Sequence, residues 1–208
     1  MESKTTFGGA PASGTGDAAF SSTTREKSFS NKSIPFAMMH LACFAALWSG
    51  VSFKALIICF VMYWLRMFAL TGGYHRYFSH RSYNTSRTFQ FILGLLGCSA
   101  VQKGPLWWSA HHRRHHRFTD QEGDVHSPRR NGFWWAHIGW VLSTRYEPTD
   151  LDGVRDFSRF PELRWLNNWH VLPAISLAML CFLIGGWQGL VWGFFVSTVA
   201  LYHCTFAI

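Results

Sequence analysis

Three observations predict an all-α, multi-pass membrane protein with four transmembrane helices and a cytoplasmic helical cap that carries clustered histidines. The chain is 49% hydrophobic and only 14% charged, whereas soluble domains are about 25% charged. Four of its apolar segments approach the roughly 20 residues that a helix needs to cross a bilayer. Thirteen of the nineteen Lys and Arg residues lie between positions 71 and 164, and basic loops of membrane proteins face the cytoplasm.

The N-terminal segment, residues 1–33, is rich in Gly, Ser, Thr and Ala and contains few apolar residues. This composition predicts a disordered tail, because such a segment cannot bury enough apolar surface to fold. It also lacks the apolar core of a secretory signal peptide. Residues 34–208 are therefore predicted to form a single membrane domain.

The predicted membrane spans form two hairpins, residues 34–50 with 53–70 and residues 165–184 with 188–208. Since two crossings return the chain to its starting side, the tail and the basic middle segment both face the cytoplasm. The apolar runs 89–101 and 133–142 are too short to span and are expected to be interfacial or buried. Arg66 lies deep in the second span, where a charge needs a structural or functional reason.

Histidines are concentrated between the two hairpins. Four of the eleven occur within six residues, 111–116. His112, His115 and His116 have the i, i+3, i+4 spacing that places side chains on one face of a helix. Three imidazoles on one face repel one another when protonated, and neutral imidazole binds iron, zinc, copper and nickel, so a shared metal explains them. A solvated basic stripe, HHRRHHR, is the alternative.

A second pair, His75 and His80, lies upstream and is weak evidence when taken alone. The five cysteines include no C-x-x-C pair and lie in apolar segments, which disfavours both a zinc finger and a disulfide framework. Nucleic-acid binding is the simplest explanation of a basic chain. It is disfavoured here because membrane-length apolar runs bracket the basic segment.

His75-x-x-x-x-His80 and His112-x-x-His115-His116 resemble the first two histidine boxes of the membrane fatty acid desaturases. The acyl-CoA, stearoyl-type delta-9 branch is the closer match. It is supported by four further segments, residues 71–76, 117–120, 124–128 and 137–140, which read TGGYHR, RFTD, DVHSP and HIGW. The resemblance extends from about residue 34 to the last residue.

The resemblance implies a function and a set of ligands. It implies a di-iron enzyme that uses O2 to remove two hydrogens from adjacent carbons of a fatty acyl-CoA or acyl-lipid. An electron donor such as cytochrome b5 or a ferredoxin would supply the electrons, and membrane lipid would surround the spans. The implied metal ligands are His75, His80, His112, His115 and His116.

The remaining histidines match no ligand box. At the position of His111 the branch often has Asp, so His111 could compete with His112. His126 and His137 are expected to make hydrogen bonds that support either the metal ligands or the fold, and His170 and His203 to lie in helices.

The family has a third box, His-x-x-His-His, and no two histidines after His126 lie within five residues of each other. We therefore expect the N-terminal part of a desaturase, whether as a fragment, a truncated reading frame or a degenerate copy, and we expect residues 1–208 alone to be inactive. Two alternatives stay open. One is a membrane hydroxylase that uses histidine boxes, and the other is a non-catalytic membrane remnant that binds one metal or none.

Overall fold

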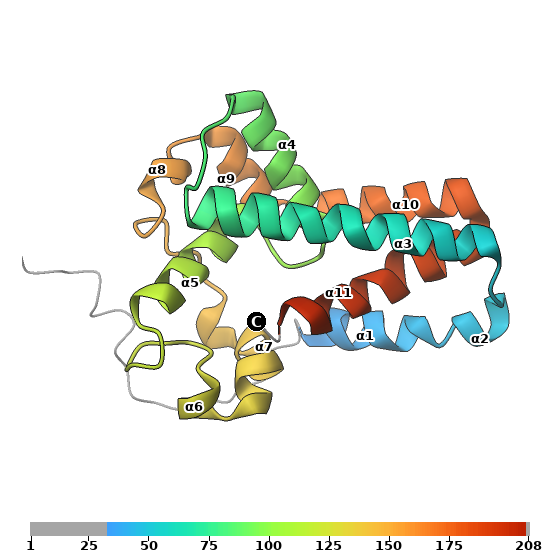
Figure 1. The fold of residues 1–208 in the computed structure, drawn as a ribbon, viewed down its shortest axis with the longest axis horizontal. Helices are drawn as coiled ribbons and strands as arrows, with labels where there is room; N and C mark the ends of the chain where they lie inside the picture. Colours follow the sequence, from blue (N-terminus) through green and yellow to red (C-terminus); the bar gives the residue numbers. More distant parts are fainter. Residues whose placement is uncertain (1–32, 207–208) are drawn as a thin grey trace, which may run out of the picture.

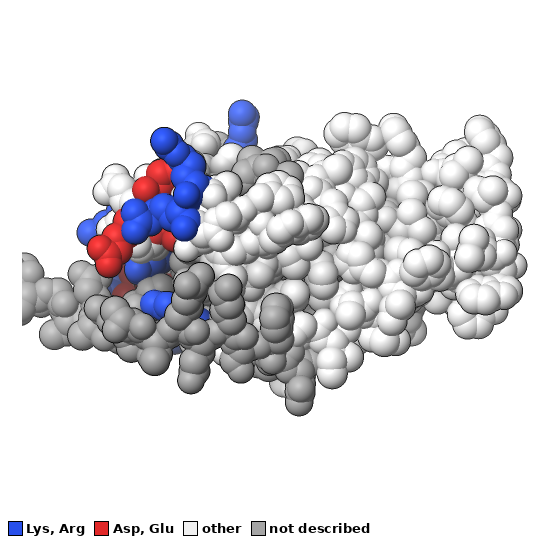
Figure 2. All heavy atoms as spheres, turned by 90° about the horizontal axis from the view of Figure 1, so that it is seen from below, with Lys and Arg blue, Asp and Glu red and all other residues white. Residues whose placement is uncertain are grey.

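The computed structural model describes residues 33–206, and their regular elements are all helices, as predicted. The predicted tail lies outside this range except for Ser33. Long apolar helices form a bundle, and shorter helices form a cap, residues 80–170, at one end of it (Figure 1). On the face seen in Figure 2, charged side chains gather over the cap, while the bundle shows none.

The first hairpin consists of α1 (Ser33–Cys43), α2 (Ala46–Ser49) and α3 (Phe53–Phe68). The chain reverses at Gly50, whose φ of 65° favours glycine. Ser52 then caps α3, because its hydroxyl accepts a hydrogen bond from the Ala55 amide at 3.2 Å. The helix continues without a break into the π-helix η1 (Ala69–Ser79).

The second hairpin consists of α10 (Val171–Gln188), the π-helix η4 (Gly189–Val196) and α11 (Ser197–Thr205). Gly186 has a φ of 59° and a ψ of −148°, which breaks the helical path. The two arms then pack so closely that a Cβ built on Gly189 would collide with the carbonyl oxygen of Cys181. The apolar stretch therefore folds back on itself (Figure 1).

The prediction of four transmembrane helices is supported only in part. By length and hydropathy, two helical stretches of the described chain can span a membrane, Phe53–Ser79 and Val171–Thr205. Ser33–Ser49 is apolar but shorter, and it is interrupted after Cys43. The predicted span 165–184 begins too early, because Trp165 belongs to the separate helix α9 (Pro161–Asn168).

The two hairpins are tied together at two levels. Far from the cap, the Lys54 ammonium donates to the Ile184 carbonyl at 2.6 Å, and the Gln188 amide donates to the Ser49 carbonyl at 2.7 Å. Closer to the cap, the fully buried Arg66 guanidinium donates to the hydroxyls of Ser197 and Thr198 in α11. These contacts supply the structural reason for a charge inside the span.

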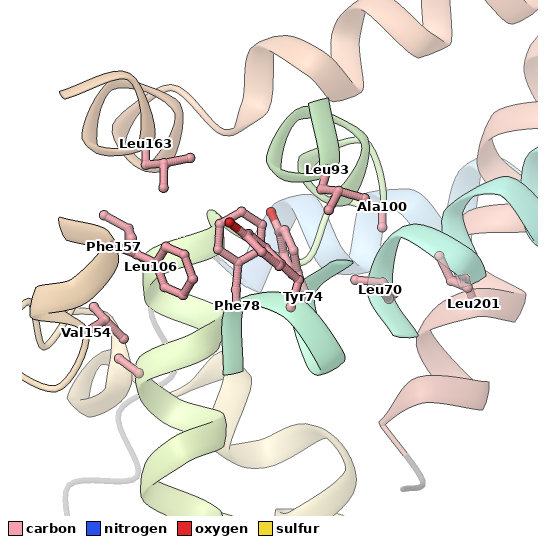
Figure 3. Packing of buried hydrophobic residues seen from close by; sticks show 12 residues of the cluster. Leu70, Tyr74, Phe78, Leu93, Ala100, Leu106, Val154, Phe157, Leu163 and Leu201 are labelled. Carbon is pink, nitrogen blue, oxygen red and sulfur yellow. The ribbon is translucent and has the colours of Figure 1, made fainter. Parts of the chain in front are cut away.

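The cap begins with α4 (Arg87–Cys98) and α5 (Pro105–Arg117) and also contains α9. The short elements between α5 and α9 are α6 (Pro128–Asn131), η2 (Trp135–Gly139), α7 (Trp140–Leu142), η3 (Thr144–Tyr146) and α8 (Arg155–Ser158). Tyr74 and Phe78 of η1 pack with Leu106 of α5, Phe157 of α8 and Leu163 of α9 (Figure 3). This core fixes η1 and α5, the two helices that carry the histidine boxes.

Candidate metal centre

The first histidine pair lies at the cap end of η1. A π-helix has i→i+5 hydrogen bonds, and the His80 amide accordingly donates to the His75 carbonyl at 3.0 Å. Residues five apart therefore meet on one face. The Nε2 atoms of His75 and His80 lie 2.9 Å apart.

The second box lies on α5, which begins at Pro105 as its first helical residue. His112 and His116 are one turn apart, and their Nε2 atoms are separated by 3.0 Å. The Trp108 indole stacks on the His112 ring, with a centroid distance of 4.6 Å and an interplanar angle of 22°. The stacking fixes the orientation of the His112 ring.

The two pairs converge to form a single group, the four-histidine cluster of His75, His80, His112 and His116. Each residue offers one ring nitrogen, and these four atoms all lie within 4.8 Å of one another. Two metal–imidazole bonds of about 2.0–2.1 Å at a right angle would place their nitrogens about 2.9 Å apart. The 2.9 Å and 3.0 Å separations fit that geometry, so the donor set suits an ion that prefers imidazole.

The two imidazoles that α5 contributes to the cluster, His112 and His116, are held neutral, as metal binding requires. Burial first, and then the neighbouring rings of His75, His116, His80 and His115, lower the pKa of His112 to about 2. Burial, with the charges of His80 and His115, also lowers the pKa of His116. At neutral pH these ring nitrogens therefore carry lone pairs that can bind a cation.

His115 does not join the four-histidine cluster. Its Nδ1 lies 2.9 Å from the Asp124 carboxylate, whose side chain is fully buried. The carboxylate also accepts the backbone amides of Asp120 at 2.9 Å and His126 at 3.2 Å. Burial raises the pKa of Asp124, but the hydrogen bonds from His115 and the two amides outweigh it, so the pKa lies below its usual range. An ionised Asp124 fixes the proton on Nδ1 of His115 and leaves the lone pair of Nε2 free to bind a metal ion.

His115, Asp124 and His126 also bring one possible ligand atom each within 4.8 Å of one another. The His126 ring, however, stacks on His115 at 4.1 Å and 22°. Lone pairs of stacked rings lie in nearly parallel planes and do not meet at one ion. His126 is therefore better placed to support the His115 ring than to bind a metal ion together with it. Burial first, and then the charge of His115, lower the pKa of His126 to about 4.

His111 lies apart from the four-histidine cluster. Its Nδ1–H donates to the Trp107 carbonyl at 2.9 Å, and its ring packs against Trp107, Trp140 and Tyr146. Burial lowers its pKa to about 4. These contacts direct the His111 ring toward aromatic side chains and away from the four-histidine cluster, so it does not compete with His112 in this structure.

The structure also contains a histidine chain that the sequence did not indicate. The His203 ring lies 3.1 Å from His40 through one nitrogen and 3.1 Å from His137 through the other. His203 lies in α11, as expected, whereas His170, also expected in a helix, is the residue that precedes α10. His137 makes a hydrogen bond with His203. His40 was not singled out, because 163 positions separate it from His203.

The described chain is all-helical, has two apolar stretches long enough to cross a membrane, and brings four imidazoles together in an arrangement that could hold a metal ion. The family profile described as fatty acid desaturase matches residues 29–208. The chain therefore belongs to the fatty acid desaturase family.

Named relatives agree with this assignment. The chain is 35% identical over 178 residues to the sn-1 stearoyl-lipid 9-desaturase of Anabaena variabilis, covering 83% of this chain and 64% of the relative. It is 34% identical over 181 residues to the sn-2 palmitoyl-lipid 9-desaturase of Nostoc sp. (strain 36), covering 83% and 62%. It is 31% identical over 174 residues to the acyl-CoA C20 Delta5-desaturase of Anemone leveillei, covering 82% and 55%. The chain thus matches between 55% and 64% of the length of these curated relatives.

Proposed function

We propose that the protein containing this chain is a fatty acid desaturase, which introduces a double bond into a fatty acyl chain with consumption of O2. The observation that carries the proposal is the convergence of four ring nitrogens, from two helices, within 4.8 Å. The family assignment and the printed names of the relatives support the same reaction class.

In this proposal the four-histidine cluster binds one iron, and His115 binds a second iron through Nε2. Iron held by imidazoles supplies the O2 chemistry that removes a hydrogen from each of two adjacent carbons. The residues of the chain hold and orient the site. Trp108 fixes the His112 ring, and Asp124 fixes the proton of His115 on Nδ1.

We further propose that the cap lies at the cytoplasmic surface and that both hairpins cross the bilayer. The fold-back at Gly186 supports two crossings by the second hairpin. For the first hairpin, the 17 residues of Ser33–Ser49 extend about 25 Å as a helix, somewhat less than the hydrocarbon core of about 30 Å. An acyl chain in the membrane would then lie close to the ring nitrogens.

The substrate class and the electron donor are also part of the proposal. The relatives include both acyl-lipid and acyl-CoA desaturases, so the acyl carrier is one of these two. The excess of Lys and Arg in the cap favours an acidic donor such as cytochrome b5 or a ferredoxin, because complementary charge accelerates encounter.

Fatty acid analysis in a desaturase-deficient host tests the function. The host would express the 208-residue chain and, separately, the longest reading frame that contains it. Unsaturated fatty acids from the longer product, abolished by His112→Ala but not by His170→Ala, are expected. A hydroxylated product would instead favour the histidine-box hydroxylase. If no product forms and the purified protein binds one metal ion or none, the non-catalytic remnant would be favoured.

A further inference from the structure

Arg113 stands between His112 and His115 in the sequence, but its side chain binds a different part of the cap. A guanidinium has five N–H donors, and Arg113 makes five hydrogen bonds. The acceptors are the Phe78 carbonyl at 2.6 Å, the Ser79 carbonyl at 3.1 Å, the Gly153 carbonyl at 3.2 Å and both Asp156 carboxylate oxygens at 2.9 Å. The Arg113 side chain is only 24% exposed and that of Asp156 19%.

Two of these acceptors are the carbonyls of Phe78 and Ser79, which immediately precede His80. They lie at the C-terminal end of η1, where the last carbonyls of a helix have no partner within the helix. Arg113 supplies that partner from α5. A single side chain therefore joins the helix of the first histidine box to the helix of the second.

Asp156 holds the guanidinium in place from the opposite side. It lies in the first turn of α8 and makes a bidentate ion pair with Arg113, and Arg81 is a second cation at 3.5 Å. The Phe157 ring lies 5.7 Å from the Arg113 guanidinium and 5.8 Å from that of Arg81. Planar, bidentate pairing makes the geometry of Arg113 specific, and a lysine cannot reproduce it.

We propose that Arg113 and Asp156 are positioning residues, which set the position of η1 relative to α5 and so keep the four imidazoles of the cluster assembled for a metal ion. The inference rests on the proposed function only in taking the cluster to be a metal site. It predicts that weakening the pair lowers metal affinity, although neither residue offers a ligand to the cluster. Supporting residues of metal sites typically contribute about 10–100-fold in affinity.

Cobalt titration tests this proposal, because Co2+ bound by imidazoles reports affinity and geometry through its visible absorption. The 208-residue chain in detergent would be compared with Arg113→Lys, which keeps the charge, and Asp156→Asn, which keeps the shape. Arg117→Lys is the matched control, because Arg117 is exposed on the same helix and contacts the Phe118 ring. Arg113→Lys should lower Co2+ affinity about tenfold or more and shift the absorption bands, and Arg117→Lys should do neither.

The remaining outcomes separate the positioning role from general destabilisation and from the proposed reaction. If Arg113→Lys does not fold, Asp156→Asn leaves the contacts to the η1 carbonyls available and should show a smaller loss of affinity with unchanged helix content. Parent affinity and parent spectrum in both variants would overturn the proposal, whatever fatty acids the protein makes. Absence of Co2+ binding by the parent chain would overturn it too, whereas the expected Co2+ results together with no desaturation by the longer reading frame would count against the proposed function alone.

Discussion

His75 and His80 face each other, with Nε2 atoms 2.9 Å apart, because the helix that carries them is a π-helix at that point. In an α-helix residues four apart would be neighbours on one face, and that position is Ser79. Ser79 is buried instead, and its hydroxyl donates to the Tyr74 carbonyl at 2.9 Å. The i+5 spacing of the first box and the π-helical turn therefore depend on each other.

This relationship predicts what happens when the histidine at position 80 is moved to position 79. His80→Ala should weaken Co2+ binding, and the double variant Ser79→His/His80→Ala should not restore it, because position 79 points into the core. Isothermal titration with Co2+ measures both. Recovery of parent affinity by the double variant would mean that this turn is α-helical in the metal-bound protein.

Asp124 is expected to control metal binding at His115, the proposed ligand of the second iron, through the tautomer of its ring. Asp124→Asn removes the negative charge that holds the proton on Nδ1, and loss of such a support costs about 10–100-fold in metal affinity. The control is Asp152→Asn, because the Asp152 side chain is 79% exposed and pairs only with Arg155 among the described ion pairs. Iron content after dialysis against a graded chelator series checks this, and equal retention in both variants would contradict it.

The buried, neutral His111 predicts a loss of stability in mild acid. Its pKa is lowered from 6.5 to about 4, so below pH 6.5 the unfolded chain takes up a proton that the folded chain does not. Stability contributed at this position is present above pH 6.5 and is lost as the pH falls toward 4. In His111→Phe the Tm measured in detergent should fall less between pH 6.5 and pH 4 than in the parent. Parallel Tm curves for the two proteins would show that His111 does not titrate in this way.

Arg66 is expected to tolerate an apolar replacement better than a conservative one. Its hydroxyl partners on α11 keep other acceptors, because Ser197 also donates to the Gly193 carbonyl and Thr198 to the Phe194 carbonyl. Arg66→Met would leave them satisfied, whereas Arg66→Lys would bury a charge with fewer hydrogen bonds. The lysine variant should be less stable than the methionine variant by about 1–3 kcal/mol, as measured by thermal unfolding in detergent. The reverse order would indicate that the charge itself is required.

Much of the candidate site could be predicted from local spacing. The i, i+4 spacing of His112 and His116 places them together, and it does so in the structure. The separation of His111 from the cluster also follows from helix geometry, because adjacent residues point about 100° apart at 3.6 residues per turn. The separation of His115 does not, because i+3 neighbours share a face, and it is the hydrogen bond to Asp124 that distinguishes His115. His115 was predicted to join His112 and His116 because its partner Asp124 could not be recognised from spacing, and the role of His111 was left open.

Other features could not be predicted from one sequence. The π-helical turn at His75 has no compositional signal, since π-bulges arise from tertiary context. The contacts of Arg113 with Asp156, and of Arg66 with Thr198, join positions that are 43 and 132 residues apart. The fold-back at Gly186 lies in the gap between the predicted spans 165–184 and 188–208, whereas the break after Cys43 has no Gly or Pro to indicate it.

Metal binding by two adjacent histidine variants tests the proposed metal centre most directly. His111 and His112 are neighbours in α5, but only His112 belongs to the four-histidine cluster. The parent chain, His111→Ala and His112→Ala would be purified in detergent and titrated with Co2+, with helix content checked by circular dichroism. The cluster predicts that His112→Ala loses the tight cobalt site while His111→Ala retains it. Equal loss in both variants, or retention of the tight site in His112→Ala, would contradict the assignment.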